Sequence, residues 1–589
     1  MKKFTMLSSV LASALMLTVA SCSSEDVAGG DSQNDKGATS FLAVNIENVG
    51  SAPASRSYQQ GDGTYEEGNE AESKITNVRF YFFNADGTPY ILNNVNGKGN
   101  YIDREVNVNP GDQSQTVEGI TETVLVLNGE NHVAPASMLT VINPDINPEL
   151  LQNGAALRWS VMRKELKGST FNDKTHFMMS NSTYEEAGND LCTTQLTGKT
   201  YASKDDAQNH PVNVYVERVN AKVNANVVGT NFEKETADVI FDGVSMKDKQ
   251  KTKVGVLSLA KEDGTSDNKD IFAYIVGWGL ASENGKAELF KQIDTQKFTD
   301  EILGINPWST PDYHRSFWSL SVPFGGTGAD KNEPVNYKFS EYTHKLGEAV
   351  YTLPNTPTEV IDDAHIYDNN LTKFVVAARL AYEDAGSLKP AEICEYKGQE
   401  FLGTDNLKKV FLNEISRYYK KVTAAGEPDK YVNLTPSDIT FTTTAPSGTQ
   451  AKDYEVFAKL ANPDITLYEQ KGGVWHEVTD KSGVNDMLQA TPAEVRTGGM
   501  AYYYTTIKHL GKKGKSGEPK LGEYGIVRNH SYQISLNSIK GFGTPVYDPD
   551  KTIVPTIPSD DKTYLAAKIN VLSWRVVPST VDLDKTEKK

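Results

Sequence analysis

The residue with the clearest potential for covalent chemistry is Cys22, which follows an apolar N-terminal segment. Two lysines near the N-terminus precede an apolar run from Met6 to Ala20, and the small residue Ser21 stands directly before the cysteine. The run is too short to span a bilayer comfortably and has the order of an export signal. Small residues before a cysteine resemble a bacterial lipobox, which predicts signal cleavage between Ser21 and Cys22 and acylation of the Cys22 thiol. The alternative is an ordinary secretory signal.

A second position suited to covalent change is the peptide bond between Arg56 and Ser57. Arg56 is the only Lys or Arg between Lys36 and Lys74, and it lies in the small, polar stretch GSAPASRSYQQ. Exposed segments of this composition are preferred sites of proteolysis. A trypsin-like or Arg-specific protease would therefore have one target in this region.

Motifs for catalysis are absent from the sequence. There is no GxSxG, GxxxxGK[ST], HExxH or CxxC pattern, and the nine His residues are scattered. The acidic pairs 185–186 and 362–363 are adjacent residues, which point to opposite faces of a strand. Cys192 and Cys394 stand far apart with no His at ligand spacing, so we expect buried thiols and neither a disulfide nor a metal site. The sequence predicts a protein that is not an enzyme and binds no cofactor or metal.

Aromatic residues offer one further chemistry, the stacking of sugars. Tyr313 and His314 lie between Trp308 and Trp318, but aromatic residues at such spacing are more often packed inside a protein. The Lys-rich segment 511–517 is interpreted as a surface hairpin loop and not as a phosphate-binding loop.

Length and charge limit the class of protein. The chain has 589 residues, with 60 Lys and Arg against 77 Asp and Glu, for a net charge of −17. This balance argues against binding to nucleic acid or other polyanions. A hydrophobic content of 38% with 28 Tyr and 21 Phe is enough for packed domains.

The pattern of apolar residues predicts a mainly β protein. Short alternating or apolar runs bounded by turn residues recur along the chain, which favours antiparallel sandwiches; they lie at 41–47, 78–83, 123–127, 212–228, 374–380, 502–507 and 531–539. Helical spacing is confined to 149–166 and 405–419. A polar stretch before residue 211 predicts a domain boundary near 210. A Pro-rich linker leads to a last strand within 564–577, which could pair with its own domain or with a neighbour.

Several blocks of this sequence resemble the fimbrillins of Bacteroidales and, within that family, the stalk subunits of the short (minor) fimbriae of Porphyromonas. Besides the lipobox and the strand ending at Arg56, these blocks are 75–87 (ITNVRFYFFNADG), 124–128 (VLVLN), 176–182 (HFMMSNS), 214–223 (VYVERVNAKV), 351–356 (YTLPNT), 374–380, 525–544 (GIVRNHSYQISLNSIKGFGT) and 571–583 (VLSWRVVPSTVDL). The sequence departs from the family at the Lys-rich hairpin and in the tail 584–589.

The resemblance implies a fold of two transthyretin-like antiparallel β-sandwich domains with small helical insertions and a C-terminal donor strand. Its implied organisation is a signal peptide at 1–21, a tether at 22–37, a propeptide strand at 38–56 removed after Arg56, an N-terminal domain at 57–210, a C-terminal domain at 211–548, a linker at 549–563 and a donor strand with tail at 564–589. The donor residues would be Leu565, Ala567, Ile569, Val571, Leu572, Trp574 and Val576.

The function that follows from this resemblance is that of a structural fimbrial subunit. The precursor would be an outer-membrane lipoprotein carrying palmitate, and the mature chain would polymerise head to tail at the cell surface by donor-strand insertion. Its partners would be further copies of itself, tip and anchor subunits, a maturation protease and receptors on host or bacterial cells, with roles in adhesion, biofilm formation and virulence. The competing interpretation is a monomeric surface lipoprotein that binds glycans through exposed Trp and Tyr residues.

Overall fold

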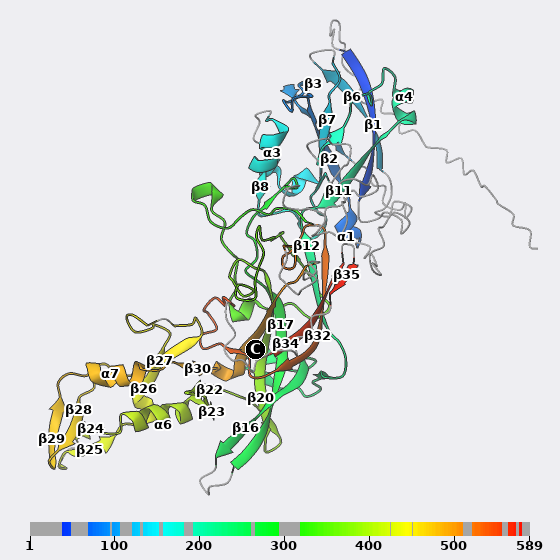
Figure 1. Ribbon diagram of the computed structural model, residues 1–589. Coiled ribbons are helices and arrows are strands. Elements are labelled where there is room, and N and C mark those ends of the chain that lie inside the picture. The colour runs from blue at the N-terminus through cyan, green and yellow to red at the C-terminus, as the bar shows by residue number, and fades with distance from the viewer. Residues whose placement is uncertain are drawn as a thin grey trace, which may run out of the picture.

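The computed structural model describes residues 38–48, 69–94, 97–105, 121–129, 133–151, 157–181, 192–260, 266–293, 318–423, 426–449, 451–509, 521–555, 564–572 and 576–579. Cys22, Arg56, Ser57, Trp574 and the Lys-rich hairpin lie outside these ranges. The described chain is mainly β and antiparallel pairs predominate, which confirms the predicted fold class. Figure 1 shows an elongated molecule in three parts.

The N-terminal part is one ten-stranded sheet, at the top of Figure 1. Its main path runs in the order β4-β3-β6-β1-β11-β9-β7-β2-β5, and β10 pairs with β7. The strands are β1 (Ala38–Asn48), β2 (Asn77–Phe83), β3 (Leu92–Asn94), β4 (Gly97–Gly99), β5 (Tyr101–Glu105), β6 (Thr121–Gly129), β7 (Ser137–Ile142), β9 (Met179–Asn181), β10 (Thr194–Gln195) and β11 (Val212–Arg218).

Apolar side chains of this sheet form two clusters. Phe80 and Phe82 of β2 pack with side chains of β1, β6 and β11. Tyr81 and Phe83 directly follow Phe80 and Phe82 in β2, and they belong to a second cluster that includes residues of the helices. This alternation follows from the two-residue period of a strand. The helical elements of this part are α1 (Glu70–Ser73), η3 (Pro144–Ile146), α2 (Pro148–Leu151), α3 (Trp159–Glu165) and α4 (Lys204–Asn209).

The turn predicted after β2 is present. Gly87 donates its N–H to the Asn84 carbonyl at 2.9 Å and has a φ of +76°, which a side chain would disfavour. A Cβ at this position would also lie 2.3 Å from Trp159 Nε1. Glycine is therefore required both for the turn and for the close approach of α3.

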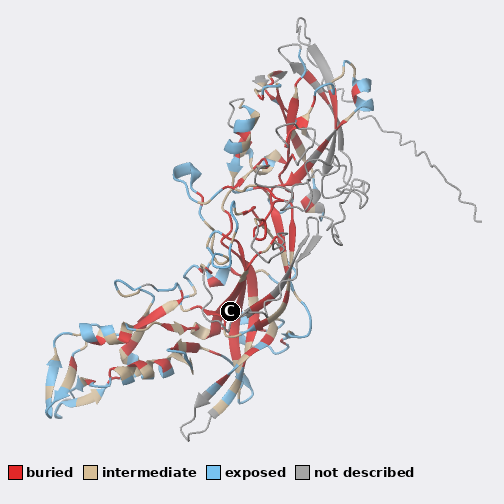
Figure 2. Cartoon of the chain, viewed as in Figure 1, coloured by how far each residue is buried: buried red, intermediate tan, exposed pale blue. Residues whose placement is uncertain are grey.

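The central part is a β-sandwich of two facing sheets. One has the order β19-β12-β32-β34-β35, and the other β13-β16-β17-β20-β31-β33, with β21 paired to β20. The strands are β12 (Ala221–Val227), β13 (Glu233–Lys234), β16 (Gln250–Ala260), β17 (Ser266–Ala281), β19 (Ala349–Thr352), β20 (Lys373–Asp384), β21 (Ser387–Pro390), β31 (Met500–Thr506), β32 (Ser531–Lys540), β33 (Thr544–Pro545), β34 (Tyr564–Leu572) and β35 (Val576–Ser579). Both sheets contribute to one core, as the buried strands in Figure 2 indicate.

The third part is an arm inserted between β21 and β31, which extends to the lower left of Figure 1. It has its own core and two sheets, of order β23-β22-β30-β27-β26 and β25-β24-β28-β29. Its elements are β22 (Ile393–Tyr396), β23 (Gln399–Leu402), α6 (Thr404–Glu414), β24 (Tyr418–Val422), β25 (Lys430–Asn433), η8 (Pro436–Asp438), β26 (Ile439–Thr442), β27 (Glu455–Leu460), β28 (Leu467–Lys471), β29 (Val474–Val478), α7 (Ser482–Gln489), β30 (Ala493–Val495) and η9 (Thr497–Gly499). The sequence pattern did not separate this arm from the C-terminal domain.

Short elements complete the fold. They are β8 (Lys167–Gly168), β14 (Ile240–Phe241), β15 (Val244–Ser245), β18 (Ala287–Glu288), η6 (Gly328–Asp330) and η7 (Phe339–Glu341). Pairing of β18 with β8 joins the central part to the N-terminal part. Cys192 and Cys394 are buried and form no disulfide, as the sequence predicts.

The two main parts meet between β11 and β12. β11 pairs within the N-terminal sheet and β12 within the central sandwich, so the change of sheet falls at Val219 and Asn220, close to the predicted boundary. A buried ion pair crosses this point, with Lys222 Nζ 2.9 Å from Glu72 Oε1. Arg218 also donates to the Glu72 carbonyl. Because buried charges are costly unless they are paired, these contacts fix how the two parts join.

Candidate functional site: an inserted first strand and a docked last strand

The first described strand, β1, lies inside the N-terminal sheet and not at its edge. It pairs antiparallel with β6, from Ala38 opposite Gly129 to Ile46 opposite Thr121. On its other side it pairs parallel with β11, from Val44 opposite Val212 to Asn48 opposite Val216. The strand predicted from alternation at 41–47 therefore lies between two strands, paired with β6 over 38–46 and with β11 over 44–48.

The side chains of β1 are part of the N-terminal core. Leu42, Ala43 and Val44 are fully buried, and Leu42 and Val44 belong to the main N-terminal cluster. Burial of two such aliphatic side chains contributes roughly 3–6 kcal/mol before ordering costs. β1 thus supplies both backbone pairing and core packing.

The walls of the site are the neighbouring strands of β1. Residues opposite one another in neighbouring strands point to the same face, so Leu42 lies with Leu125, and Val44 lies with Val212. A sheet without β1 would have two unpaired edges and an open apolar floor formed by Leu125, Leu127, Val212, Val214 and Val216. Sequence reasoning did not name these residues, although the alternation at 212–216 was a usable signal for one wall.

The last strands of the chain are docked on their own central sandwich. β34 pairs antiparallel with β32 from Tyr564 opposite Lys540 to Leu572 opposite Ser531, and β35 pairs with β34 at the edge of the sheet. Leu565 is buried in the central core. Of the two pairings that the sequence left open, the structure contains the one within the same chain.

The predicted donor residues are distributed along this docked hairpin. Leu565, Ala567, Ile569 and Val571 stand two positions apart in β34, and all four positions are paired with β32. Leu572 ends β34 and Val576 begins β35. Trp574 lies outside the described residues. The strand expected to enter a neighbouring subunit is therefore paired within its own subunit in this structure.

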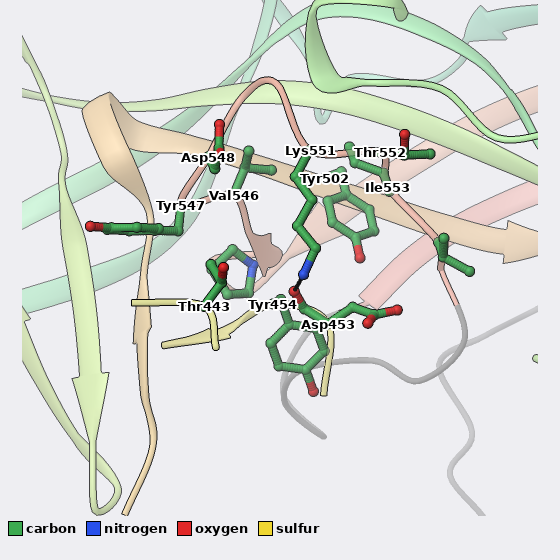
Figure 3. Close-up of a pocket in the computed structure, with 12 residues that line it drawn as sticks. Thr443, Asp453, Tyr454, Tyr502, Val546, Tyr547, Asp548, Lys551, Thr552 and Ile553 are labelled. Carbon is green, nitrogen blue, oxygen red and sulfur yellow. Dashed lines mark hydrogen bonds between the residues drawn. The ribbon is translucent and has the colours of Figure 1, made fainter. Parts of the chain in front are cut away.

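The first half of the predicted linker is anchored to the body of the protein. Val546 and Ile553 are buried beside Tyr502 of β31, and Ile553 donates its N–H to the Tyr337 carbonyl at 2.8 Å. Lys551 donates to the Asp453 carbonyl of the arm at 2.8 Å, as Figure 3 shows. Residues 549–555, expected to lie in an extended linker, are therefore held against the sandwich and the arm.

A small cavity of about 30 Å³ lies at this anchor, between the arm, β31 and residues 545–554 (Figure 3). Its volume suits water and not an organic ligand. Burial raises the pKa of Tyr502 and of Tyr454, which keeps both phenols neutral. The cavity belongs to the packing of the anchor.

The described residues contain no cluster of His, Cys, Asp and Glu that could hold a metal ion. Within the same ranges, no helix is long and apolar enough to cross a membrane. Trp318, considered above for sugar stacking, is buried against Val527, and the other members of that group lie outside the described residues.

Comparison with solved structures found weak overall similarity to fimbrial proteins. A fimbrilin, FimA, from Porphyromonas gingivalis W83 is 12% identical with a TM-score of 0.34, covering 92% of this chain and 98% of that chain. The tip fimbrial protein Mfa3 from Porphyromonas gingivalis is 10% identical with a TM-score of 0.27, covering 90% and 99%. A search of curated proteins found no match.

The family comparison gives a more specific result for the C-terminal region. Residues 496–579 match the family model described as "Major fimbrial subunit protein type IV, Fimbrillin, C-terminal". This range begins shortly before β31 and includes β31, β32 and the docked hairpin β34–β35. The match confirms the resemblance to fimbrillins, since residues 496–579 of this chain are similar to the C-terminal region of that family.

Proposed function

We propose that this chain is a stalk subunit of a cell-surface fimbria that polymerises after loss of its first strand. Export as a lipoprotein through Cys22 would hold the precursor at the outer membrane. Cleavage between Arg56 and Ser57 would release residues 38–56, and the C-terminal strand of another copy would fill the vacated groove. The filament would serve adhesion, with tip and anchor subunits at its ends.

The observation that carries this proposal is the central position of β1. Its removal would expose the edges of β6 and β11 and a floor of buried aliphatic residues, the kind of site that β-strand addition requires. A strand at the edge of the sheet would leave only one unpaired neighbour. An inserted strand leaves a groove with two hydrogen-bonding walls, which accepts one new strand and no more.

The docked hairpin supports a step of exchange. In a single subunit, β34 pairs with the backbone along the edge of β32 and places Leu565 in the core. Donation would exchange the pairing of β34 with β32 and β35 for pairing with β6 and β11 of a neighbour, so the backbone of the strand stays paired on both sides. Before cleavage, β1 competes from within the same chain at an effective concentration on the order of millimolar, which favours the closed precursor.

The test is the first residue of the surface form. Mass spectrometry of filaments sheared from cells should find Ser57 at the N-terminus of the assembled subunit, and lipid-modified Cys22 in the membrane-bound precursor. Assembled filaments whose subunits all begin at lipidated Cys22 would refute maturation at Arg56. Monomers alone at the surface, with Cys22 as the first residue, would support the glycan-binding lipoprotein instead.

A further inference from the structure

A large open cavity, distinct from the strand groove, lies where the N-terminal part meets the central sandwich. Its volume is about 610 Å³, within the range of about 300–1,000 Å³ that is typical of small-molecule sites. Asn172 and Lys174 line it from the N-terminal part, while β17, β19 and the segment 337–348 line it from the sandwich. The cavity is therefore formed by both parts of the subunit.

Aromatic side chains form much of its wall. Tyr337 and Tyr342 meet edge to face, with ring centres 6.2 Å apart, and Tyr351 lies beyond them. Glycine in β17 makes this possible, because a Cβ at Gly279 would lie 2.9 Å from Tyr342 Cδ1. A Cβ at Gly277 would lie 1.9 Å from the Tyr342 carbonyl oxygen. The two glycines let the tyrosine segment lie directly on the strand.

Three carboxylates stand beside these rings, and each is held by a local contact. Glu341 accepts the Lys338 N–H at 2.7 Å and Glu348 accepts the Lys345 N–H at 2.9 Å, in both cases through Oε2. Glu283 accepts the Tyr337 hydroxyl at 2.8 Å through Oε1. One oxygen of Glu341 and one of Glu348 are thus fixed, which orients the other oxygen of each before a ligand binds.

The charge of the lining selects the ligand class. The exposed carboxylates of Glu341 and Glu348 stand against one ammonium, that of Lys174, while burial raises the pKa of Glu283, so phosphate and other anions are disfavoured. Hydroxyl groups can donate to carboxylate oxygens, and the half-buried rings of Tyr337 and Tyr351 can contact the C–H faces of sugar rings, while Tyr342 is buried and supports Tyr337. The wide opening and the spread of polar groups suit an extended polyhydroxy ligand better than a single small cation.

We propose that this cavity binds a neutral saccharide. The proposal does not depend on strand exchange, because the groove of β1 and the docked hairpin contribute no residue to the lining. A polymer built from such subunits would present one saccharide site per copy along its length. This is a function beyond the structural role of the subunit.

Two variants test the cavity without removing its supporting contacts. Ala349→Trp fills it from a half-buried position in β19. The pair Glu341→Gln and Glu348→Gln removes two charges, while each Gln oxygen still accepts the same backbone N–H. The matched control is Trp475→Ala at the far end of the arm, where Trp475 stacks on Tyr431 with ring centres 4.3 Å apart.

The assay is saturation-transfer NMR on the purified full subunit with lactose, N-acetyllactosamine, maltotriose and α1,2-mannobiose. 3′-Sialyllactose and spermidine serve as charged probes. We expect transfer from at least one neutral saccharide, a loss of affinity of about tenfold or more in both cavity variants, and no change in Trp475→Ala. Transfer from none of the four neutral saccharides overturns the proposal, as does binding of spermidine alone.

Two further outcomes distinguish the site from its alternatives. Loss of binding in Trp475→Ala with full binding in both cavity variants would place a sugar site on the arm and overturn this one. Circular dichroism and the melting temperature check that Ala349→Trp is folded. If it is not, the Gln pair decides the result, since it preserves both turns. Filament formation by the variants is measured separately. A failure to polymerise would therefore not change the result of the saccharide-binding assay.

Discussion

The ammonium of Lys291 lies 2.6 Å from the carboxylate of Glu217, and both side chains are completely buried at the junction of the two main parts. Glu217 belongs to β11 of the N-terminal sheet, and Arg528, from the loop before β32, lies 3.0 Å from the same carboxylate. Arg528 also donates to Ser180 Oγ and to the Leu289 carbonyl, each at 3.0 Å. One carboxylate is therefore the shared partner of two buried cations that come from the other side of the junction.

Glu217→Ala should destabilise the protein by about 3–5 kcal/mol, because it leaves buried cations without their counter-charge. Burial already lowers the pKa of Lys291, and Glu217 opposes that effect. Urea unfolding monitored by fluorescence measures the change. The matched control is Asp248→Ala, which removes an exposed pair with Lys234 at 2.8 Å and should change stability far less, because solvent screens such a pair. Equal effects of the two substitutions would refute the structural role of the Glu217 contacts.

Arg56→Ala should leave a folded, lipidated precursor that does not polymerise, because β1 remains in its groove. SDS-resistant ladders on immunoblots of whole cells measure polymer length. Arg56→Lys is the matched variant, since a trypsin-like protease accepts it and an Arg-specific one does not. Ladders of normal length from Arg56→Ala would exclude cleavage at this residue as the trigger.

A disulfide between β1 and β6 should separate cleavage from loss of the strand. Leu42 and Leu125 are opposite one another and both buried. Leu42→Cys with Leu125→Cys in a secreted form should be cleaved after Arg56, yet remain monomeric until a reductant releases β1. Size-exclusion chromatography before and after dithiothreitol measures this, with each single Cys variant as a control. Polymerisation of the oxidised double variant would contradict the groove assignment.

Deletion of residues 564–589 should give subunits that are cleaved but do not elongate. The central sandwich would lose β34 and β35 and expose the edge of β32, while β1 and its groove are unaffected. Negative-stain microscopy of sheared material reports filament length. Such a subunit, once cleaved, should still accept a strand and stop growth when added to normal subunits. Filaments of unchanged length from the deletion alone would refute the donor assignment.

Glu288→Gln should stabilise the protein at pH 8 and leave it unchanged near pH 4.5. Burial raises the pKa of Glu288 to about 7, and the charges of Lys167 and Arg528 only partly oppose this. The folded state then holds a proton that the unfolded state has lost, so stability falls as pH rises from about 4.5 to about 7 and is constant above. Because the side chain is partly exposed, we expect a gain of about 1–2 kcal/mol at pH 8.

Urea titrations at pH 4.5, 6 and 8 measure this difference. Glu333→Gln is the control, since Glu333 is exposed and its pair with Lys331 lies at the surface. A stability difference between Glu288→Gln and the parent that does not change with pH would contradict the prediction.

Local pattern was enough to predict strands and turns. Alternation at 41–47 and 78–83 found β1 and β2, and the Asn-Ala-Asp-Gly turn after β2 is present. Helical spacing at 405–419 found α6, but the helix ends at Glu414 and β24 begins at Tyr418. The end was missed because Tyr418 pairs with Glu469 of β28, a contact that spacing within one segment cannot reveal.

The periodicity of the sequence could not predict which strands pair with one another. The run at 212–228 was predicted as one apolar region, yet it divides at Val219 and Asn220 between two parts of the protein. Its first half pairs in parallel with β1, more than 160 positions away, and such long-range partners leave no local signature. For the same reason the arm was not separated from the sandwich, since the pairing of its strands with one another is also long-range.

The parallel pairing of β1 with β11 also has a consequence for folding. β1 completes a core that includes Leu125, Val214 and Val216. A domain without a strand in this position would have a gap in its sheet and an incomplete core. In our proposal the cleaved subunit is less stable than the precursor, and the strand of a neighbour restores the free energy of folding that was lost with β1. Pulling a donated strand out of the filament would then break the same contacts that complete the fold of the accepting domain. The force needed to extract one strand would therefore report on the stability of that domain.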